Sequence, residues 1–394
     1  MKVLVIPAWF NNTNLNEGVF IHKYCEVLKK NGMDVSLLYI KTYGIRNIVE
    51  YFRSIKYGYP VTYKIIEVKK IVWPGIARSK TGIRAFKTRL LKKAYRRLKP
   101  EKPEIIHLQS VCNNLTSYIG KELAGKIKIP YVITEHYTSF KEAGDVLFKP
   151  FMSLTEVVNI VKGANSRVAV SKFSAKMYHE IFDTDFKALP NIMSPVFFEM
   201  PFAAKNKITD EFVFLFVGSL TRRKGIHVLL DAVKQLKREK KKIKLEVIGT
   251  GEEFDSAQRF IMQEGLEGHV ILYGYKTESE IVDFMDRSHA LILPSEKETF
   301  GLVVVESLLR GRPVLAFDLE PLKEILSVED GLLVKNTGTV DGLVNGIRAF
   351  ITDYSGFDQN KIRERAISKF NEKAIVNAYA DIYQSAINDE RKKL

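Results

Sequence analysis

Residues 294–315 read Pro294-Ser-Glu-Lys-Glu-Thr-Phe-Gly-Leu-Val-Val-Val-Glu-Ser-Leu-Leu-Arg-Gly-Arg-Pro-Val-Leu315 and set one acid, Glu306, inside a largely apolar run from 302 to 309. An ionised carboxylate in apolar surroundings costs on the order of several kcal/mol unless it is paired. We therefore expect Glu306 to meet either a cation or a set of hydroxyl donors. The glycine and the apolar run predict a helix that begins near Gly301 and leads to a strand at 314–317.

A second acid, Glu298, stands eight residues before the first, just ahead of Phe300. The first free N–H groups of the expected helix belong to Gly301, Leu302 and Val303, and the glycine lets an anion approach them closely. Two acids therefore flank a helix end that can bind an anion. Carboxylates accept hydrogen bonds from hydroxyls, so the pattern indicates a ligand with both phosphates and sugar hydroxyls, which describes a nucleotide sugar.

The composition of the chain limits the class of protein to which it can belong. It has 394 residues, 46% hydrophobic and 27% charged, and a formal net charge of +15. These values are typical of a soluble globular protein of two or three domains with an acidic partner: nucleic acid, an anionic membrane face or phosphorylated substrates. Cys25 and Cys112 fit a reducing cytosol and predict neither a disulfide framework nor a zinc site. Residues 1–10 read as a buried strand, and no run is long enough to span a membrane, so we expect any membrane contact to be peripheral.

Short apolar runs alternate with amphipathic helical stretches twice along the chain, which is the pattern of parallel sheets covered by helices on both faces. The expected strands are residues 3–6, 35–39, 105–108, 131–134 and 167–170, then 212–217, 245–248, 270–273, 290–293 and 314–317. Prolines and polar residues interrupt the periodicity between 190 and 207. The fold class is therefore α/β, with two Rossmann-like, doubly wound domains at 1–197, completed by a C-terminal helix at 376–394, and at 198–375.

A cationic turn follows the first strand of the second domain and reads Gly218-Ser-Leu-Thr-Arg-Arg-Lys-Gly225. Arg223 and Lys224 stand near the positive end of the next helix, so their charge and the helix dipole act together on a diphosphate. The alternative is a solvated basic loop. That alternative loses ground because Glu298 and Glu306 belong to the carboxyl edge of the same sheet, where open α/β sheets bind ligands.

Three other turns carry weaker signals. Gly249-x-Gly251 is either a tight turn or a close approach of the backbone to a ligand. His136 ends a strand of the first sheet and faces the expected cleft, where a structural and a functional role are about equally favoured. Gly18, between the first strand and helix, either meets a phosphate or simply opens the helix. The dehydrogenase fingerprint Gly-x-Gly-x-x-Gly is absent from this turn, which argues against nicotinamide chemistry.

Two stretches have an ordinary and a functional interpretation. Asp183-x-Asp185 has the spacing of a metal-binding pair, but a polar helix-to-strand turn favours aspartates in any case. Residues 83–98 form a basic amphipathic helix, which either lies on anionic lipid or packs its apolar side into a domain core and leaves its cations solvated. Its apolar side consists of Ile83, Phe86, Leu90, Leu91 and Leu98.

Several of these signals together resemble glycosyltransferase family 4, a retaining group with the GT-B fold. They are Glu298-x7-Glu306 with Phe300-Gly301, Gly311-x-Pro313-Val314, and the turn from Gly218 to Gly225. The resemblance covers nearly the whole chain and is strongest from 212 to 334. It implies a donor site in the second domain, an acceptor site in the first, a reaction in the central cleft between them, and no metal or other cofactor.

The resemblance also implies roles for single residues. Glu298 meets hydroxyls of the donor sugar, Glu306 meets the nucleotide ribose, Arg223 and Lys224 hold the diphosphate, and His136 lies near the transferred sugar and the leaving phosphate. The catalytic set is His136, Glu298, Arg223 and Lys224. The donor-binding set is Gly18, Gly218, Arg223, Lys224, Gly249, Gly274, Tyr275, Glu298, Phe300, Gly301, Leu302, Val303 and Glu306, with Gly274 and Tyr275 where the family's backbone usually meets the base.

The chain departs from the family at Ser219, where many members have arginine, and at Thr299, where glycine is frequent. The implied function is transfer of a sugar from a UDP-sugar, or a GDP-sugar, to a glycan or lipid-linked acceptor in polysaccharide or cell-envelope synthesis. The implied place is the cytoplasm, with peripheral contact to an anionic membrane face. Two alternatives stand beside it: a nucleotide-sugar epimerase of the same architecture, and a basic binding protein without catalysis. No recognition motif favours nucleic acid.

Overall fold

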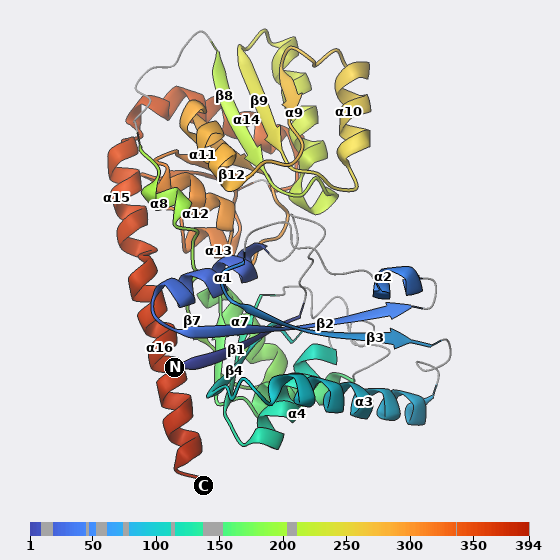
Figure 1. The fold of residues 1–394 in the computed structure, drawn as a ribbon. Helices are drawn as coiled ribbons and strands as arrows, with labels where there is room; N and C mark the ends of the chain where they lie inside the picture. Colours follow the sequence, from blue (N-terminus) through green and yellow to red (C-terminus); the bar gives the residue numbers. More distant parts are fainter. Residues whose placement is uncertain are drawn as a thin grey trace. The chain divides into compact units, whose positions relative to one another are not determined.

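The computed structural model describes residues 1–8, 19–44, 47–52, 61–73, 79–111, 115–136, 153–202, 211–335 and 337–393. The chain divides into two compact units. Unit 1 comprises Met1–Ile192 and Lys373–Leu394, and unit 2 comprises Met193–Glu372. Each unit holds one parallel sheet with helices on both faces, as the alternation of apolar and amphipathic stretches predicts (Figure 1).

Unit 1 contains a seven-stranded sheet in the order β3-β2-β1-β4-β5-β6-β7. Its strands are β1 (Lys2–Pro7), β2 (Asp34–Gly44), β3 (Lys64–Val72), β4 (Ile105–Gln109), β5 (Tyr131–Glu135), β6 (Ser166–Ala169) and β7 (Lys187–Ala188). All pairings between them are parallel. The strand order reverses at β1, which lies between β2 and β4, so the carboxyl ends of β1 and β4 form a topological switch point.

Helices cover both faces of this sheet. They are α1 (Val19–Lys30), α2 (Ile48–Phe52), α3 (Lys80–Leu98), α4 (Leu115–Ile127), α6 (Leu154–Lys162), α7 (Lys172–Phe182) and α16 (Glu372–Arg391). One core forms between the sheet and the helices α3, α4, α6 and α7, and a second core forms between the opposite face and the helices α1 and α16. The last helix of the sequence therefore completes the core of the N-terminal unit.

The basic helix expected at 83–98 is α3, and the structure favours the core alternative for it. Phe86, Leu90 and Leu98 are buried against the sheet, and Leu91 packs at the edge of the same core. The apolar side of α3 is thus covered by its own unit. Its cations lie on the other side of the helix, where most of them are exposed to solvent.

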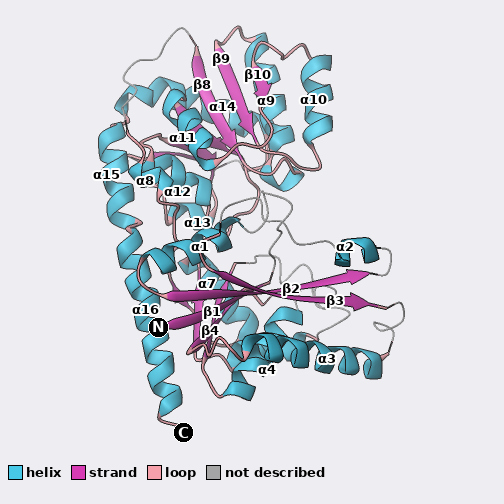
Figure 2. Ribbon diagram, in the orientation of Figure 1, coloured by secondary structure: helices cyan, strands magenta, loops and turns pink. Residues whose placement is uncertain are grey.

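Unit 2 contains a six-stranded sheet in the order β10-β9-β8-β11-β12-β13. Its strands are β8 (Phe212–Val217), β9 (Ile243–Ile248), β10 (Val270–Leu272), β11 (Ala290–Leu293), β12 (Val314–Phe317) and β13 (Gly331–Val334). Its helices, cyan in Figure 2, are α8 (Val196–Glu199), α9 (Ile226–Arg238), α10 (Phe254–Gln263), α11 (Glu278–Arg287), α12 (Leu302–Leu309), α13 (Glu320–Lys323), α14 (Val340–Asp353) and α15 (Gln359–Lys369). The order reverses at β8, so a switch-point crevice opens where β8 and β11 end.

The helix expected near Gly301 is α12, and glycines bound it at both ends. Gly301 is the residue before its first turn and has φ +94°. After its last turn Gly311, with φ +64°, donates to the Leu308 carbonyl at 2.9 Å, and Arg312 N–H donates to the Ser307 carbonyl at 2.9 Å. This pair of bonds is a Schellman motif, which requires a left-handed residue that glycine supplies without strain.

Candidate functional site

Two loops meet at the carboxyl ends of β8 and β11: the turn 218–225 and the loop 294–301. The Glu296 N–H donates to the Arg223 carbonyl at 2.9 Å. Gly225 has φ +73°, and a Cβ on it would lie 1.9 Å from the Pro294 carbonyl oxygen. Only glycine allows this approach, so the backbone holds the cationic turn against the loop that carries Glu298.

Lys224 and Glu298 form an ion pair across this junction. The distance from Lys224 Nζ to Glu298 Oε1 is 2.6 Å, and the side chains are 17% and 9% exposed. Arg223, beside them on the turn, is exposed. The structure therefore brings three of the expected catalytic residues together at the switch point of unit 2, with one cation paired to an acid and another directed to solvent.

The glycines of the neighbouring turns serve backbone packing. A Cβ on Gly249, which has φ +133°, would lie 1.9 Å from the Gly218 carbonyl oxygen, and a Cβ on Gly251 would lie 2.4 Å from the Leu220 carbonyl oxygen. The Gly249 N–H donates to the Gly274 carbonyl at 2.8 Å. The tight-turn interpretation of Gly249-x-Gly251 thus accounts for both glycines. Figure 2 shows the β8, β9 and β10 ends that these turns follow.

The residues around the start of α12 have two roles: Phe300 is buried and fixes the loop, and Leu302 and Val303 begin the helix. Phe300 is 4% exposed and its ring contacts Phe370 at a centroid distance of 6.0 Å, so its side chain fixes the loop and does not point to solvent. The N–H groups of Leu302 and Val303 belong to the first turn of α12 and have no carbonyl acceptor within the helix. Tyr275, on the turn after β10, is 38% exposed.

Glu306 lies on α12 and is partly exposed. No cation or hydroxyl of the protein bonds Glu306 among the described residues, which leaves the hydroxyls of a ligand as the expected partner, so this pairing stays a prediction. Burial, and then the nearby Glu278 carboxylate, raise the pKa of Glu306 from 4.5 to about 8. The acid avoids an unpaired charge by holding its proton near neutral pH, which is the usual response of an unpaired carboxyl group in apolar surroundings.

This raised pKa predicts a pH dependence of stability. The folded pKa of Glu306 lies above the unfolded value, so its contribution is complete below about pH 4.5 and is lost as pH rises through 8. Relative to Glu306→Gln, the wild-type free energy of unfolding should fall by about 1–2 kcal/mol between pH 4.5 and 8.5, a figure reduced for partial exposure. Chemical denaturation of both proteins across this range measures it, and a constant difference would contradict the assignment.

Of the expected residues in unit 1, His136 stands at the carboxyl end of β5. Its Nε2 lies 2.8 Å from Gln109 Oε1, and its ring contacts Phe20 at a centroid distance of 4.9 Å. Burial lowers the pKa of His136 to about 3, so its ring is neutral at physiological pH. Gly18 lies outside the described residues.

Residues 199–369 match the family model described as glycosyl transferases group 1. The chain is a glycosyltransferase. It is similar to an uncharacterized glycosyltransferase of Methanocaldococcus jannaschii, with 24% identity over 73% of this chain and 76% of that protein. It is equally similar to glycogen synthase of Mycobacterium tuberculosis, with 24% identity over 74% of this chain and 71% of the relative.

Solved structures give the fold of the glycosyltransferase. One similar structure is Anabaena Alr3699/HepE in complex with UDP and glucose, with a TM-score of 0.71, 17% identity, and coverage of 98% of this chain and 100% of that one. The two parallel-sheet units and this likeness identify the fold as GT-B, as the sequence resemblance implied.

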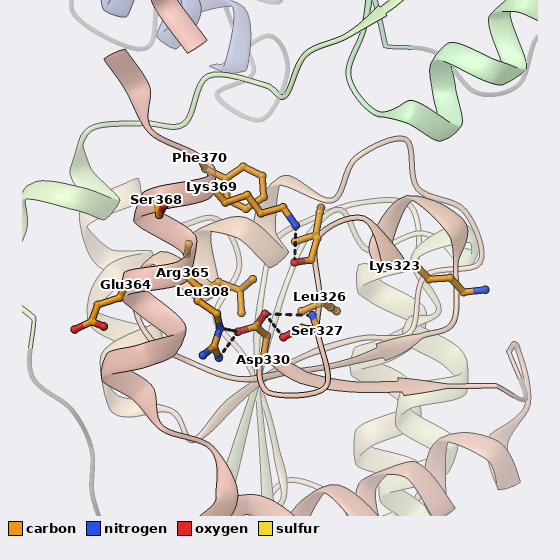
Figure 3. Close-up of a pocket in the computed structure, with 12 residues that line it drawn as sticks. Leu308, Lys323, Leu326, Ser327, Asp330, Glu364, Arg365, Ser368, Lys369 and Phe370 are labelled. Atoms are coloured by element: carbon orange, nitrogen blue, oxygen red, sulfur yellow. Dashed lines mark hydrogen bonds and ion pairs between the residues drawn. The ribbon is translucent and has the colours of Figure 1, made fainter. Parts of the chain in front are cut away.

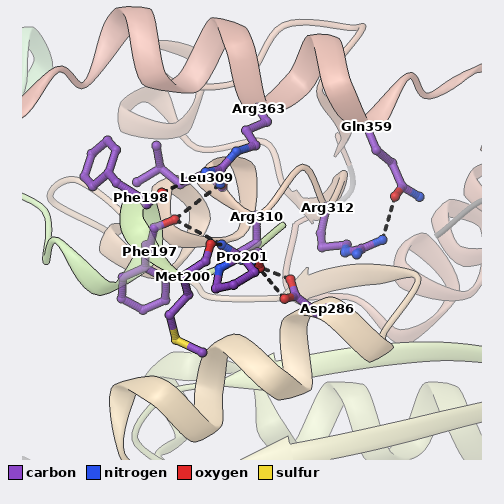
Figure 4. Close-up of polar contacts among 10 residues, drawn as sticks. All are labelled: Phe197, Phe198, Met200, Pro201, Asp286, Leu309, Arg310, Arg312, Gln359 and Arg363. Atoms are coloured by element: carbon purple, nitrogen blue, oxygen red, sulfur yellow. Dashed lines mark hydrogen bonds and ion pairs between the residues drawn. The ribbon is translucent and has the colours of Figure 1, made fainter. Parts of the chain in front are cut away.

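The sequence did not single out two arginines in unit 2 of the glycosyltransferase, the buried Arg310 and the half-buried Arg363. Arg310 is 0% exposed, pairs with Asp286 through two bonds of 3.0 and 2.6 Å, and donates to the Met200 carbonyl at 2.9 Å (Figure 4). Arg363 donates to the Phe198 carbonyl at 2.8 Å. Both side chains fasten the segment that enters unit 2. The only sequence signal of Arg310 is the stretch Arg310-Gly311-Arg312 after an apolar helix, which is too common to predict burial, and Arg363 has no such signal.

A cavity of about 580 Å³ lies elsewhere in unit 2 of the glycosyltransferase, beside α15 (Figure 3). The three cations that line it are already paired. Arg365 bonds Asp330, Lys323 bonds Asp318 and Glu320, and Lys369 donates to a backbone carbonyl. An entering phosphate would have to break these pairs, so the cavity is a poorer anion site than the exposed Arg223 and the α12 N-terminus.

Proposed function

We propose that this glycosyltransferase is a retaining, metal-independent member of family 4 that moves a hexosyl group from a nucleoside-diphosphate sugar to a glycan or lipid-linked acceptor. The observation that carries the proposal is the junction of the turn 218–225 with the loop 294–301. It gathers an exposed Arg223, the Lys224–Glu298 pair and the start of α12 at one sheet edge. A polysaccharide or cell-envelope product is consistent with the relatives named above.

The chemistry of this junction suits departure of a diphosphate. As the bond to the sugar breaks, negative charge grows on the leaving phosphate and an oxocarbenium-like sugar forms. Arg223, Lys224 and the first N–H groups of α12 supply positive charge and donors for that phosphate, already oriented before the reaction. Glu298, which pairs with Lys224, accepts a hydrogen bond from a hydroxyl of the donor sugar. The fixed cations thus do the work that a divalent ion does in other transferases.

Glu306 is suited to the ribose of the nucleotide. The two neighbouring hydroxyls of the ribose would donate hydrogen bonds to the Glu306 carboxylate. These bonds would replace the hydration that the carboxylate loses on burial. UDP is the favoured nucleotide because the similar Anabaena structure contains it. For retention, we infer that the acceptor attacks the face from which the diphosphate leaves, and that the leaving phosphate takes the acceptor's proton while neutral His136 lies beside the sugar.

The exposed cations of α3 support peripheral contact with an anionic membrane face, where a lipid-linked acceptor would lie. No helix within the described ranges is long and apolar enough to cross a membrane. Since the apolar side of α3 is in the core, this contact would be electrostatic and sensitive to salt.

Donor binding tests the proposal. Glu306→Gln should weaken binding of the preferred nucleotide sugar, from a panel of UDP- and GDP-sugars, by about 1–3 kcal/mol, because a charged hydrogen bond to the ribose is lost. The loss should grow from pH 6.5 to 9 as the wild-type carboxyl ionises. Titration calorimetry measures it.

Glu264→Gln is the matched control, because Glu264 pairs with Lys234 beyond the end of α10, remote from the two loops. If wild type and Glu306→Gln bound every donor with equal affinity, the assigned contact between Glu306 and the ribose would be contradicted. Product analysis without an acceptor separates transfer from epimerisation, since an epimerase converts the donor alone.

A further inference from the structure

A chain of buried polar side chains lies behind His136. Gln109 Oε1 lies 2.8 Å from His136 Nε2, and Gln109 Nε2 lies 3.4 Å from His107 Nε2. On its far side, His107 Nδ1 lies 2.8 Å from the hydroxyl of Tyr24 and 2.6 Å from the hydroxyl of Tyr383. Gln109 is 2% exposed and His107 is 0% exposed. The chain thus runs from the expected catalytic histidine to the C-terminal helix α16.

The two ends of an amide differ, and in the orientation that the structure gives the Gln109 amide this difference assigns the protons of both rings. The Gln109 oxygen only accepts, so the His136 Nε2 that it faces must carry a proton. The Gln109 nitrogen only donates, so the His107 Nε2 that it faces must accept. The proton of neutral His107 then sits on Nδ1, where the two tyrosine hydroxyls accept it. Thr134 Oγ1, 2.8 Å from His107 Nε2, is compatible as a second donor.

Hydrogen bonds on both sides of Gln109 fix the backbone that carries its side chain. Its carbonyl accepts from the Ala8 N–H at 2.8 Å, and Ser110, the next residue, has the left-handed φ of +71°. The buried Glu135 carboxylate accepts from the Val111 N–H at 2.7 Å and from the His136 N–H at 2.8 Å. One acid therefore ties the end of β4 to the end of β5 and sets the distance between Gln109 and the ring.

We propose that Gln109 is a positioning residue that holds His136 in the Nε2–H tautomer, with Nδ1 as the nitrogen that accepts. His107 and Tyr383 hold the Gln109 amide in the orientation that this requires. The C-terminal helix thereby takes part in the chemistry of unit 1. The expected effect of Gln109 on the rate of sugar transfer rests on the proposed role of His136. The expected tautomer of His136 does not rest on that role.

Nitrogen-15 NMR of the full chain tests the tautomer directly. With His136 assigned through His136→Asn, the wild-type ring should show a protonated Nε2 and an unprotonated Nδ1 at pH 7. In Gln109→Leu the ring should become a mixture of tautomers, and kcat should fall about 10–100-fold, the scale for losing an orienting partner, with KM nearly unchanged. Gln109→Glu should keep the Nε2–H form, because a carboxylate also accepts.

The acid variant adds a second readout. Its charge raises the pKa of His136, so the acid limb of the kcat/KM profile should move to higher pH by about one unit or more. Tyr383→Phe should weaken the tautomer preference without touching Gln109. Gln359→Leu is the matched control: this buried glutamine of unit 2 bonds Arg312 and Tyr354, and its loss should leave the His136 signals unchanged.

The outcomes distinguish the positioning role of Gln109 from the catalytic role of His136. An unaltered His136 tautomer in Gln109→Leu overturns the positioning role, and so does an Nδ1–H form in the wild type. A changed tautomer with wild-type kcat supports the positioning role and counts against the catalytic role of His136.

Discussion

Replacement of Lys224 by alanine is expected to lower sugar transfer by about 100- to 1,000-fold, the scale for removing one donor aimed at developing charge. The change removes a cation from the leaving phosphate and also leaves Glu298, whose side chain is 9% exposed, without its counter-charge. An unpaired acid beside a diphosphate repels it. Steady-state kinetics with the preferred donor measures the loss, which should appear chiefly in kcat.

The double variant Lys224→Ala/Glu298→Gln separates the two contributions. Because it removes both charges of the pair, thermal stability should return toward the wild-type value while transfer stays low. Lys276→Ala is a control, since Lys276 pairs with Glu280 on unit 2 outside the junction. If Lys224→Ala kept more than about a third of the wild-type kcat/KM, the pair would be structural and the diphosphate would lie elsewhere.

Replacement of Arg310 by methionine is expected to destabilise unit 2 by about 3–5 kcal/mol, the scale for breaking a buried ion pair on one side. Asp286 would lose both of its bonds, and the carbonyls of Met200 and Pro201 would lose their donor. Urea unfolding followed by circular dichroism measures the change in midpoint.

Arg348→Met is the matched control for this variant, because Arg348 pairs with Glu239 at side-chain exposures of 40% and 31%. Its loss should cost less than about 1 kcal/mol. If Arg310→Met had a similarly small effect, the carbonyls of Met200 and Pro201 would accept hydrogen bonds from water after the arginine is removed.

The sequence predicted the strands that are mainly apolar, and it missed β3, β7 and β13. Residues 212–217 and 290–293 were found because buried central strands are continuous apolar runs. β3 contains lysines at 64, 69 and 70 and stands at the sheet edge, where one side of the backbone faces solvent. β7 has only two residues, and β13 is an edge strand that begins with a glycine. A polar edge strand, or a run of two residues, gives no continuous apolar stretch that a sequence pattern can detect.

The same limit applies to the site. The helix end at Gly301 follows from local pattern, and its position was confirmed. The pairing of Lys224 with Glu298 joins residues 74 positions apart and depends on β8 lying beside β11, which the sequence alone does not state. Likewise, the pKa of Glu306 is raised first by burial and then by another acid, Glu278, which stands on a helix whose approach only the fold reveals.

The placement of α16 has a consequence for the order in which the protein matures on the ribosome. Tyr379 and Tyr383 are buried in the second core of unit 1, between the sheet and α1, yet they are synthesised after all of unit 2. The continuous segment Met193–Glu372 can therefore fold while one apolar face of the N-terminal sheet is covered by α1 alone. Nascent chains paused before residue 372 should present that face to chaperones, and release of the final helix should end the interaction.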